Sequence, residues 1–175
     1  MSGRYAADEV HATADCNTHD WMDDAGVRET LLHDREGVVI RCSLPDGTEW
    51  ALETSLWELV SLYALVEFGV AGSVVVHMGY HVRTELQSGA NRRLDLTTWT
   101  TRDGDPDGEW VPHRTGPTIH GPTPALLGLL ADPIGQVVER LRAHGMDRAA
   151  VRRRYEDGHQ GPKTETTLWS RLSDS

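Results

Sequence analysis

The chain has few cysteines and few basic residues, and it lacks a long hydrophobic run. Cys16 and Cys42 are its two cysteines, whereas an extracellular disulfide scaffold uses more bridges in a shorter chain. Its longest apolar stretch, residues 56–68, is interrupted by polar and charged residues and is too short to span a bilayer. No apolar run follows Met1, so a secretory signal peptide is not expected. These absences together favour a reducing, cytoplasmic setting.

Acidic residues outnumber basic ones, which gives the 175-residue chain a formal net charge of -10 at pH 7. Because such a field repels phosphates and acidic headgroups, the molecule as a whole is a poor binder of nucleic acid and of anionic membranes. Hydrophobic residues make up 38% of the chain and charged residues 25%, a composition typical of a globular protein. A chain of this length buries a core without metals or disulfides, so we expect a single domain.

Composition divides the chain into an arm, a domain and a tail. Residues 1–24 are polar and lack apolar periodicity, which predicts a loosely held N-terminal arm. Residues 25–157 form the expected α+β domain, and the polar residues 158–175 form a flexible tail, apart from Trp169. The predicted architecture is an antiparallel or mixed sheet of short strands packed on a buried central helix, with a helical pair at residues 124–157.

The first part of the domain shows the alternation of a β-hairpin. Apolar and polar residues alternate over residues 38–44, turn residues follow at 45–47, and the alternation resumes at 50–52. Residues 27–34 fit either a preceding strand, which would complete a three-stranded meander, or a short helix. The sequence therefore predicts the hairpin and leaves two alternatives for the segment before it.

A central helix is expected to begin after Ser55. Ser55 and Glu58 have the spacing of a capping box, in which each side chain accepts a free N–H of the first turn. Apolar residues lie on most sides of the segment that follows, up to a stop at Gly69. We therefore expect this helix to be buried against the sheet.

More strands are expected after the central helix. Residues 73–82, with three consecutive valines, predict a buried strand. Residues 94–101 and 109–112 predict a second hairpin, and the residues rich in Gly, Pro and Thr from 113 to 124 predict a linker.

Two helices are expected near the C-terminus. Asp132 and Pro133 have the order of an N-cap residue followed by a proline at the first helical position, which predicts that a helix begins there. Apolar residues follow at helical spacing up to Gly145. Asp147 can cap a further helix, so a tight turn would join the two.

Histidine and cysteine gather in the N-terminal region. A tetrahedral zinc ion could be bound by imidazole and thiolate ligands from His11, Cys16 and His19, with Cys42 or His33 completing the set. Zinc would also order the polar arm, because metal-binding free energy becomes folding free energy. Only one half of this set is paired in sequence, so the alternative is an arm in which these residues occur incidentally.

Two further clusters could hold a metal. Residues 103–108 match the first half of a calcium loop, but Arg114 occupies the position of the closing glutamate, so a solvated hairpin tip is the simpler explanation. His77 and His81 would share one face of a strand, where they could ligate a metal or act as acid and base. The alternative is two imidazoles on the solvent face of a strand whose valines point inward.

The expected C-terminal helices carry positive charge in an otherwise acidic chain. Two helices joined by a short glycine-containing turn have the outline of a helix-turn-helix, whose arginines could contact phosphates or guanine edges. Surface helices are commonly rich in arginine, so these side chains could instead pair with the acidic N-terminal region or with a partner subunit. The candidate residues for nucleic-acid contact are Arg148, Arg152, Arg153 and Arg154.

The sequence has no phosphate-binding glycine loop, nucleophile elbow or zinc-protease helix, so we favour a protein without enzymatic activity. Its composition favours an accessory protein that binds another macromolecule, most simply a protein, through an acidic surface bearing tryptophans. Trp21, Trp99 and Trp110 are the expected contacts, although packing in the core or in a hairpin explains them as well. The alternatives are a zinc-binding protein or metal-dependent hydrolase that uses the histidines and cysteines, and a DNA-associated regulator that uses the arginines.

Overall fold

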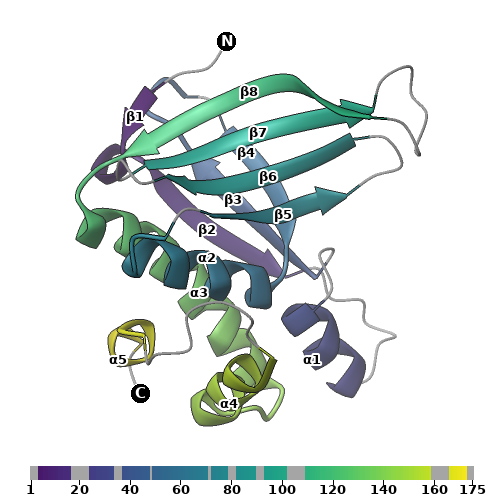
Figure 1. The fold of residues 1–175 in the computed structure, drawn as a ribbon. Coiled ribbons are helices and arrows are strands. Elements are labelled where there is room, and N and C mark those ends of the chain that lie inside the picture. Colours follow the sequence, from purple (N-terminus) through teal and green to yellow (C-terminus); the bar gives the residue numbers. More distant parts are fainter. Residues whose placement is uncertain are drawn as a thin grey trace.

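Two β-sheets and a layer of helices make up this α+β protein (Figure 1). The computed structural model describes residues 4–16, 24–33, 37–47, 49–70, 72–78, 82–89, 93–101, 109–158 and 166–172. Helices α2 and α3 lie next to the sheets, and α4 and α5 lie on the side of these helices away from the sheets (Figure 1). The predicted class is confirmed, since short strands, a central helix packed against them and C-terminal helices are all present.

The larger sheet has five strands in the order β1-β8-β7-β6-β5. β1 pairs with β8 in parallel, and the other neighbours are antiparallel. The strands are β1 (Arg4–Ala6), β5 (Gly72–Met78), β6 (Val82–Gly89), β7 (Arg93–Thr101) and β8 (Trp110–His120).

Strand β8 corrects the prediction of a linker after Pro112. The strand continues to His120, because it pairs with β7 on one side and with β1 on the other. The register between β7 and β8 shifts twice, and Pro112 and Pro117 lie at these irregularities. A strand tolerates proline at a bulge, where the missing N–H costs no ladder hydrogen bond. Pro117, which the sequence predicts in a linker, is therefore part of a long strand.

The smaller sheet contains three antiparallel strands in the order β2-β3-β4. They are β2 (His11–Cys16), β3 (Val38–Ser43) and β4 (Glu49–Thr54). β3 and β4 are the hairpin that the alternation predicts, with Gly47 in the turn at a left-handed φ of 87°. The third strand of this sheet comes from the N-terminus rather than from residues 27–34.

The N-terminal segment, residues 4–16, contributes a strand to each sheet, which corrects the prediction of a loose polar arm. β1 joins β8, a 3-10 helix (Ala7–Glu9) follows, and β2 joins β3. Its buried residues are Ala7 and Val10. The segment is held by backbone pairing, which needs no apolar periodicity, and composition therefore gave no sign of it.

Helix α1 (Asp24–His33) precedes the hairpin and confirms the helical alternative for this region. Val27, Leu31 and Leu32 are almost completely buried. Their spacing of four and one residues places them on one side of a helix, whereas a strand would have turned Leu31 and Leu32 to opposite faces. Burial of this side decides between the two alternatives.

Helix α2 (Leu56–Glu67) is the central helix, as predicted. Ser55 Oγ accepts a hydrogen bond from the Glu58 N–H at 3.2 Å, as the serine of a capping box does. At the other end Gly69 has a left-handed φ of 64°, the conformation in which glycine commonly ends a helix. The buried residues of α2 are Leu56, Leu59, Val60, Leu62, Tyr63, Ala64 and Val66.

Helix α3 (Thr123–Ala143) begins well before the predicted start at Asp132. Pro124 lies in its first turn, where the missing N–H has no intrahelical partner to lose. Pro133 lies inside the helix and is buried, and the burial of a long apolar face outweighs the hydrogen bond that this proline removes. No helix in the described ranges, α3 included, is long and apolar enough to cross a membrane. The buried face comprises Leu126, Leu127, Leu130, Pro133, Ile134, Val137, Val138 and Leu141.

Helix α4 (Arg148–Gly158) follows α3 after a tight turn. Gly145 has a left-handed φ of 90°, which ends α3 at the residue that the sequence predicts. Asp147 Oδ1 accepts a hydrogen bond from the Ala150 N–H at 2.7 Å, so Asp147 caps α4 as predicted.

The C-terminal segment, residues 166–172, packs into the core and corrects the prediction of a flexible tail in this range. It contains the short helix α5 (Leu168–Arg171), in which Leu168 is 0% and Trp169 3% exposed. Thr167 Oγ1 lies 3.0 Å from Tyr63 Oη, and the Thr167 N–H donates to Glu67 Oε1 at 2.8 Å. Both partners belong to α2, so the segment docks on the central helix.

Candidate binding site beside helix α3

The predicted zinc ligands are separated by the register of the smaller sheet. Cys42 pairs with Ala12, and Cys16 lies four positions after Ala12 on the same strand. The two cysteines therefore share one face of the sheet but lie about 13 Å apart along the strands. His11, one residue before Ala12, points to the opposite face. These three residues do not meet at one point, and His19 lies outside the described residues. Within the described ranges, no group of three or more His, Cys, Asp or Glu side chains could hold a metal ion.

Both cysteines are better described as partly buried thiols than as metal ligands. Burial raises the pKa of Cys42 to about 11. Burial also raises the pKa of Cys16, although the nearby Arg140 guanidinium opposes this shift. A metal is bound by the thiolate, which such an environment disfavours. His33, the alternative ligand, lies on α1 with its ring centroid 5.5 Å from that of Trp57.

The other predicted residues are only partly covered by the described chain. His77 lies on β5 beside a register shift, and its strand partner is Thr84. Trp99 and Trp110 lie on the neighbouring strands β7 and β8. Outside the described residues lie His81, Trp21 and the Asp-rich loop at 103–108.

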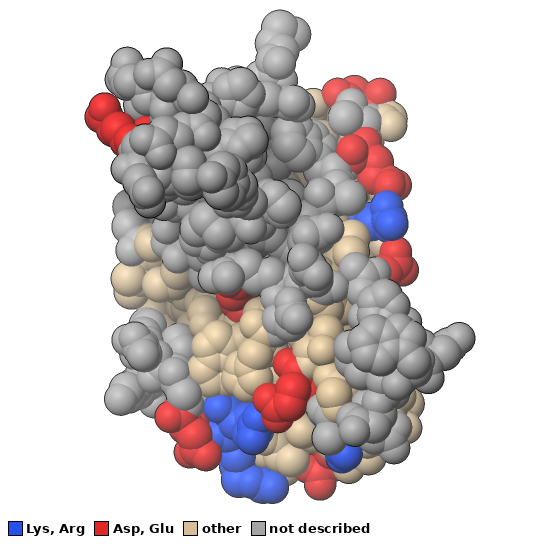
Figure 2. All heavy atoms as spheres, turned by 90° about the vertical axis from the view of Figure 1, so that its right-hand side faces the viewer, with Lys and Arg blue, Asp and Glu red and all other residues tan. Residues whose placement is uncertain are grey.

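Two of the α4 arginines predicted to contact nucleic acid are engaged in ion pairs. Arg152 pairs with Glu156 at 2.8 Å, one helical turn away. Arg154 pairs with Glu29 at 2.6 Å and so links α4 to α1. On the lower half of the face drawn in Figure 2, blue basic groups lie next to red carboxylates, as such pairing requires. Arg153 is exposed, and Arg148 lines a cavity that is described below.

A cavity of about 470 Å³ lies between the N-terminal segment and α3; we call it the acidic cavity. Its charged side chains include the carboxylates of Asp8 and Asp132, which are both exposed to solvent. The 3-10 helix supplies Asp8 and α3 supplies Asp132. The lining residues are Ala7, Asp8, Val10, His11, Ala12, Thr13, Leu129, Asp132 and Gln136.

Strand β2 turns backbone groups toward this cavity. Ala14 N–H donates to Gln136 Oε1 of α3 at 2.9 Å, so it points away from β3. In an antiparallel pair, residues two positions apart direct their backbone groups to the same side. The N–H and C=O of Ala12, which lines the acidic cavity, are therefore directed away from β3 as well. The cavity thus combines two carboxylates with the backbone of an edge strand.

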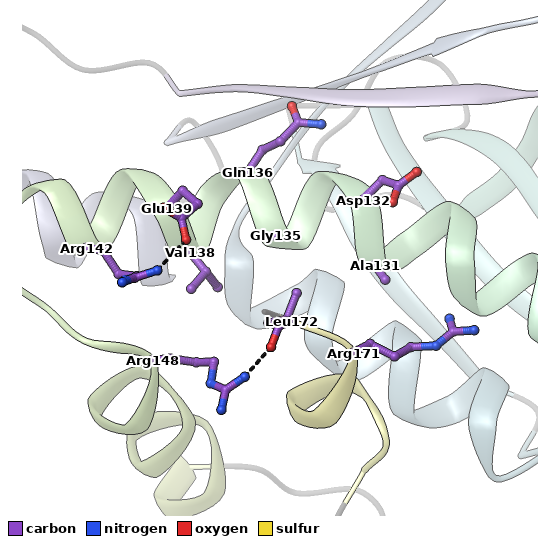
Figure 3. Close-up of a pocket in the computed structure, with 10 residues that line it drawn as sticks. All are labelled: Ala131, Asp132, Gly135, Gln136, Val138, Glu139, Arg142, Arg148, Arg171 and Leu172. Atoms are coloured by element: carbon purple, nitrogen blue, oxygen red, sulfur yellow. Dashed lines mark hydrogen bonds and ion pairs between the residues drawn. The ribbon is translucent and has the colours of Figure 1, made fainter. Parts of the chain in front are cut away.

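A second cavity, of about 480 Å³, lies between α3, α4 and α5; we call it the arginine-lined cavity (Figure 3). It shares Asp132 and Gln136 with the acidic cavity, so the two lie on either side of the exposed face of α3. Its basic residues are Arg142, Arg148 and Arg171, one from each of the three helices. The carboxylates of Asp132 and Glu139 also line this cavity, and Arg142 pairs with Glu139 at 2.7 Å.

No protein-family model, curated protein or solved structure matches the chain. The chemistry of these two cavities and the charge of the molecule are therefore the features that bear on its function.

Sequence reasoning missed both cavities. Their walls come from segments that are far apart in the chain, as the contact of Ala14 with Gln136 across 122 positions illustrates. The sequence predicts that Asp8 lies in a loose arm and that Asp132 caps a helix. No local pattern marks either residue, since each becomes part of a site only when the N-terminal segment docks beside α3.

Proposed function

We propose that this protein is a non-enzymatic binding protein that recognises a cationic group of another macromolecule, most simply a protein, at the acidic cavity. The observation that carries the proposal is the pair of exposed carboxylates, Asp8 and Asp132, on the walls of one cavity. Carboxylates from two separate elements at one cavity favour a positively charged ligand.

The expected ligand is an arginine or lysine side chain of the partner. A guanidinium presents five N–H donors in a fixed fork, which suits carboxylates and carbonyl oxygens arranged around it. Asp8, Asp132 and the Ala12 carbonyl are acceptors of this kind. The aliphatic part of the partner side chain would lie against Val10 and Leu129, which also line the cavity.

The charge of the whole molecule supports the same partner. With a net charge of -10, the protein attracts a basic surface over a long range and steers it during encounter. Internal ion pairs neutralise several arginines, among them Arg41 with Asp15 at 2.7 Å and Arg154 with Glu29 at 2.6 Å. The partner is also predicted to contact Trp21, Trp99 and Trp110.

The test uses an acetylated and amidated tetra-arginine peptide as a defined cationic probe, with binding measured by isothermal titration calorimetry. Asp8→Asn combined with Asp132→Asn removes both carboxylates of the cavity. The matched control is Glu9→Gln combined with Asp157→Asn, which changes the net charge equally at exposed residues that do not line the cavity.

The cavity variant should bind the peptide at least about tenfold more weakly than the wild type, the loss expected for one charge-assisted hydrogen bond or more. The control should stay within about twofold, since it loses only long-range attraction. Equal losses in the two variants would show that the peptide responds to net charge alone, and the proposed site would then be abandoned.

A further inference from the structure

Strand β2 forms an edge of the smaller sheet, and the acidic cavity lies along that edge. Because β2 comes first in the order β2-β3-β4, only one of its sides pairs with another described strand. His11 and Thr13 lie on one face of the sheet and Ala12 lies on the other, yet all three line the cavity. A cavity that touches residues of both faces extends around the edge of the strand, so the backbone of β2 is part of its wall.

The edge of β2 is already occupied at Ala14. Gln136 Oε1 of α3 accepts a hydrogen bond from the Ala14 N–H at 2.9 Å, as the carbonyl of a neighbouring strand would. Figure 3 shows Gln136 and Asp132 on the side of α3 away from Arg148 and Leu172. A side-chain amide therefore takes the place of a strand at this one position of the edge.

Ala12 is the open position of the edge. Its N–H and C=O are directed away from β3, like those of Ala14. Two residues earlier, the Val10 N–H donates to the Ala7 carbonyl at 3.3 Å, so this donor is used within the N-terminal segment. Among the described residues, no acceptor pairs with the Ala12 N–H. The edge therefore presents a backbone donor and a backbone acceptor to the cavity, both from Ala12.

A cationic side chain by itself does not satisfy the Ala12 N–H. Arginine and lysine side chains carry donors only, whereas an N–H needs an acceptor. A peptide residue other than proline carries both a carbonyl and an N–H, and opposed residues of an antiparallel pair exchange two hydrogen bonds through these groups. The cavity thus suits a ligand that combines a cationic side chain with an extended peptide backbone.

We infer that the acidic cavity binds an extended basic segment of a partner protein, which adds to β2 as a short strand. One residue of the segment exchanges two backbone hydrogen bonds with Ala12, while Asp8 and Asp132 accept from a cationic side chain. The Ala12 carbonyl has two lone pairs, so it can accept from the backbone and from a guanidinium alike. Gln136 closes the edge at Ala14, which keeps the added strand short. The inference rests on the proposed function and adds backbone pairing to it.

The test measures amide hydrogen exchange of the full-length protein by NMR, first alone and then saturated with the acetylated and amidated tetra-arginine peptide. Exchange of the Ala12 N–H should slow at least about tenfold, because a peptide carbonyl accepts from it in the complex. The Thr13 N–H faces β3 and should change less than about twofold. Agmatine, a guanidinium compound without a carbonyl, is the control ligand, and at saturation it should slow Ala12 exchange less than about twofold.

A pair of variants tests the same hydrogen bond through affinity. Ala12→Pro removes the N–H and should weaken binding of the peptide about three- to tenfold, the usual contribution of one hydrogen bond. Proline is tolerated on an edge strand where its nitrogen faces away from the neighbouring strand. Ala12→Ser keeps the N–H and should bind within about twofold of the wild type. The exchange measurement on the wild type decides the question whether or not Ala12→Pro folds.

The outcomes separate this inference from the proposed function. If the peptide does not bind, or binds equally well when Asp8 and Asp132 are both replaced by asparagine, the proposed function and the inference fail together. If the peptide binds at the cavity but leaves Ala12 exchange unchanged, or if agmatine slows this exchange equally, only the added strand is overturned. Equal affinities of folded Ala12→Pro and Ala12→Ser would overturn it as well.

Discussion

The two ends of the described chain dock by different forces, although both looked loose in the sequence. The N-terminal segment is held through the backbone of β1 and β2, and its buried residues are only Ala7 and Val10. The C-terminal segment is held through side chains, above all Leu168 and Trp169, which are buried in the core. Backbone pairing spreads stability over many residues, whereas side-chain docking concentrates it in few. The C-terminal segment should therefore be far more sensitive to a single substitution.

Trp169→Ala should have the largest effect. Trp169 is 3% exposed and its ring centroid lies 6.2 Å from that of Tyr155, so truncation leaves a cavity where α4 and α5 meet. The expected loss in the free energy of unfolding is about 3 to 5 kcal/mol, measured by urea denaturation. The exposed neighbour provides the control, since Ser170→Ala should change stability by less than about 0.5 kcal/mol.

Amide hydrogen exchange would sharpen the comparison further. In Trp169→Ala, amides of residues 166–172 should lose protection relative to those of β2, because local opening of the C-terminal segment leaves the strand pairing intact. A uniform loss of protection along both segments would instead show that the two ends open as one unit.

The stability of the protein at alkaline pH tests whether the N-terminal segment helps to shield the Cys42 thiol from water. Cys42 lies opposite Ala12 of this segment, and burial raises the pKa of Cys42 to about 11 from the ordinary value of 9.0. As the pH rises, the Cys42 thiol therefore loses its proton in the unfolded chain before it does so in the folded protein. The contribution of Cys42 to the free energy of unfolding is complete below pH 9.0 and declines toward about pH 11.

Stability should consequently fall between pH 8 and pH 10, and Cys42 should account for on the order of 1 kcal/mol of that fall. The measurement is urea denaturation of the wild type and of Cys42→Ala at both pH values. The variant should show a smaller fall than the wild type. Identical falls would mean that water reaches the Cys42 thiol in the folded protein.

Gln136→Ala should have the smallest effect and acts on the N-terminal segment. It removes the acceptor of the Ala14 N–H, a hydrogen bond whose side-chain partner is exposed, so the loss should be about 0.5 to 1 kcal/mol. Gln136→Glu keeps an oxygen acceptor and serves as the control. If exchange of the Ala14 amide accelerates in the alanine variant alone, the side-chain contact is confirmed; equal acceleration in both variants would contradict it.

Elements defined by local signals were predicted well. The hairpin of β3 and β4 follows from alternation and turn residues, α2 from the Ser55 cap and the Gly69 stop, and the start of α4 from Asp147. Each of these signals acts within a few residues, through a capping hydrogen bond or through a backbone conformation that glycine favours. Tertiary packing is consistent with these local signals.

Long-range pairing decided the elements that the sequence did not reveal. β8 extends through Pro117 because bulges against β7 accommodate proline, and α3 passes through Pro133 because its buried face outweighs a lost hydrogen bond. Cys16 and Cys42, two of the predicted zinc ligands, are separated by the register of β2 on β3. In each case the deciding partner lies far away in sequence, where local propensity carries no information.

The sequence by itself determined the α+β class, the acidic charge and the central helix, because composition and short-range hydrogen bonding suffice for these. Tertiary structure alone decided that the described terminal segments, residues 4–16 and 166–172, dock, and with them the two cavities beside α3. The acidic cavity exists because β2 lies next to α3, and the arginine-lined cavity exists because Trp169 anchors α5. Sites built from several elements have no sequence signature, since their geometry arises only when the core is packed.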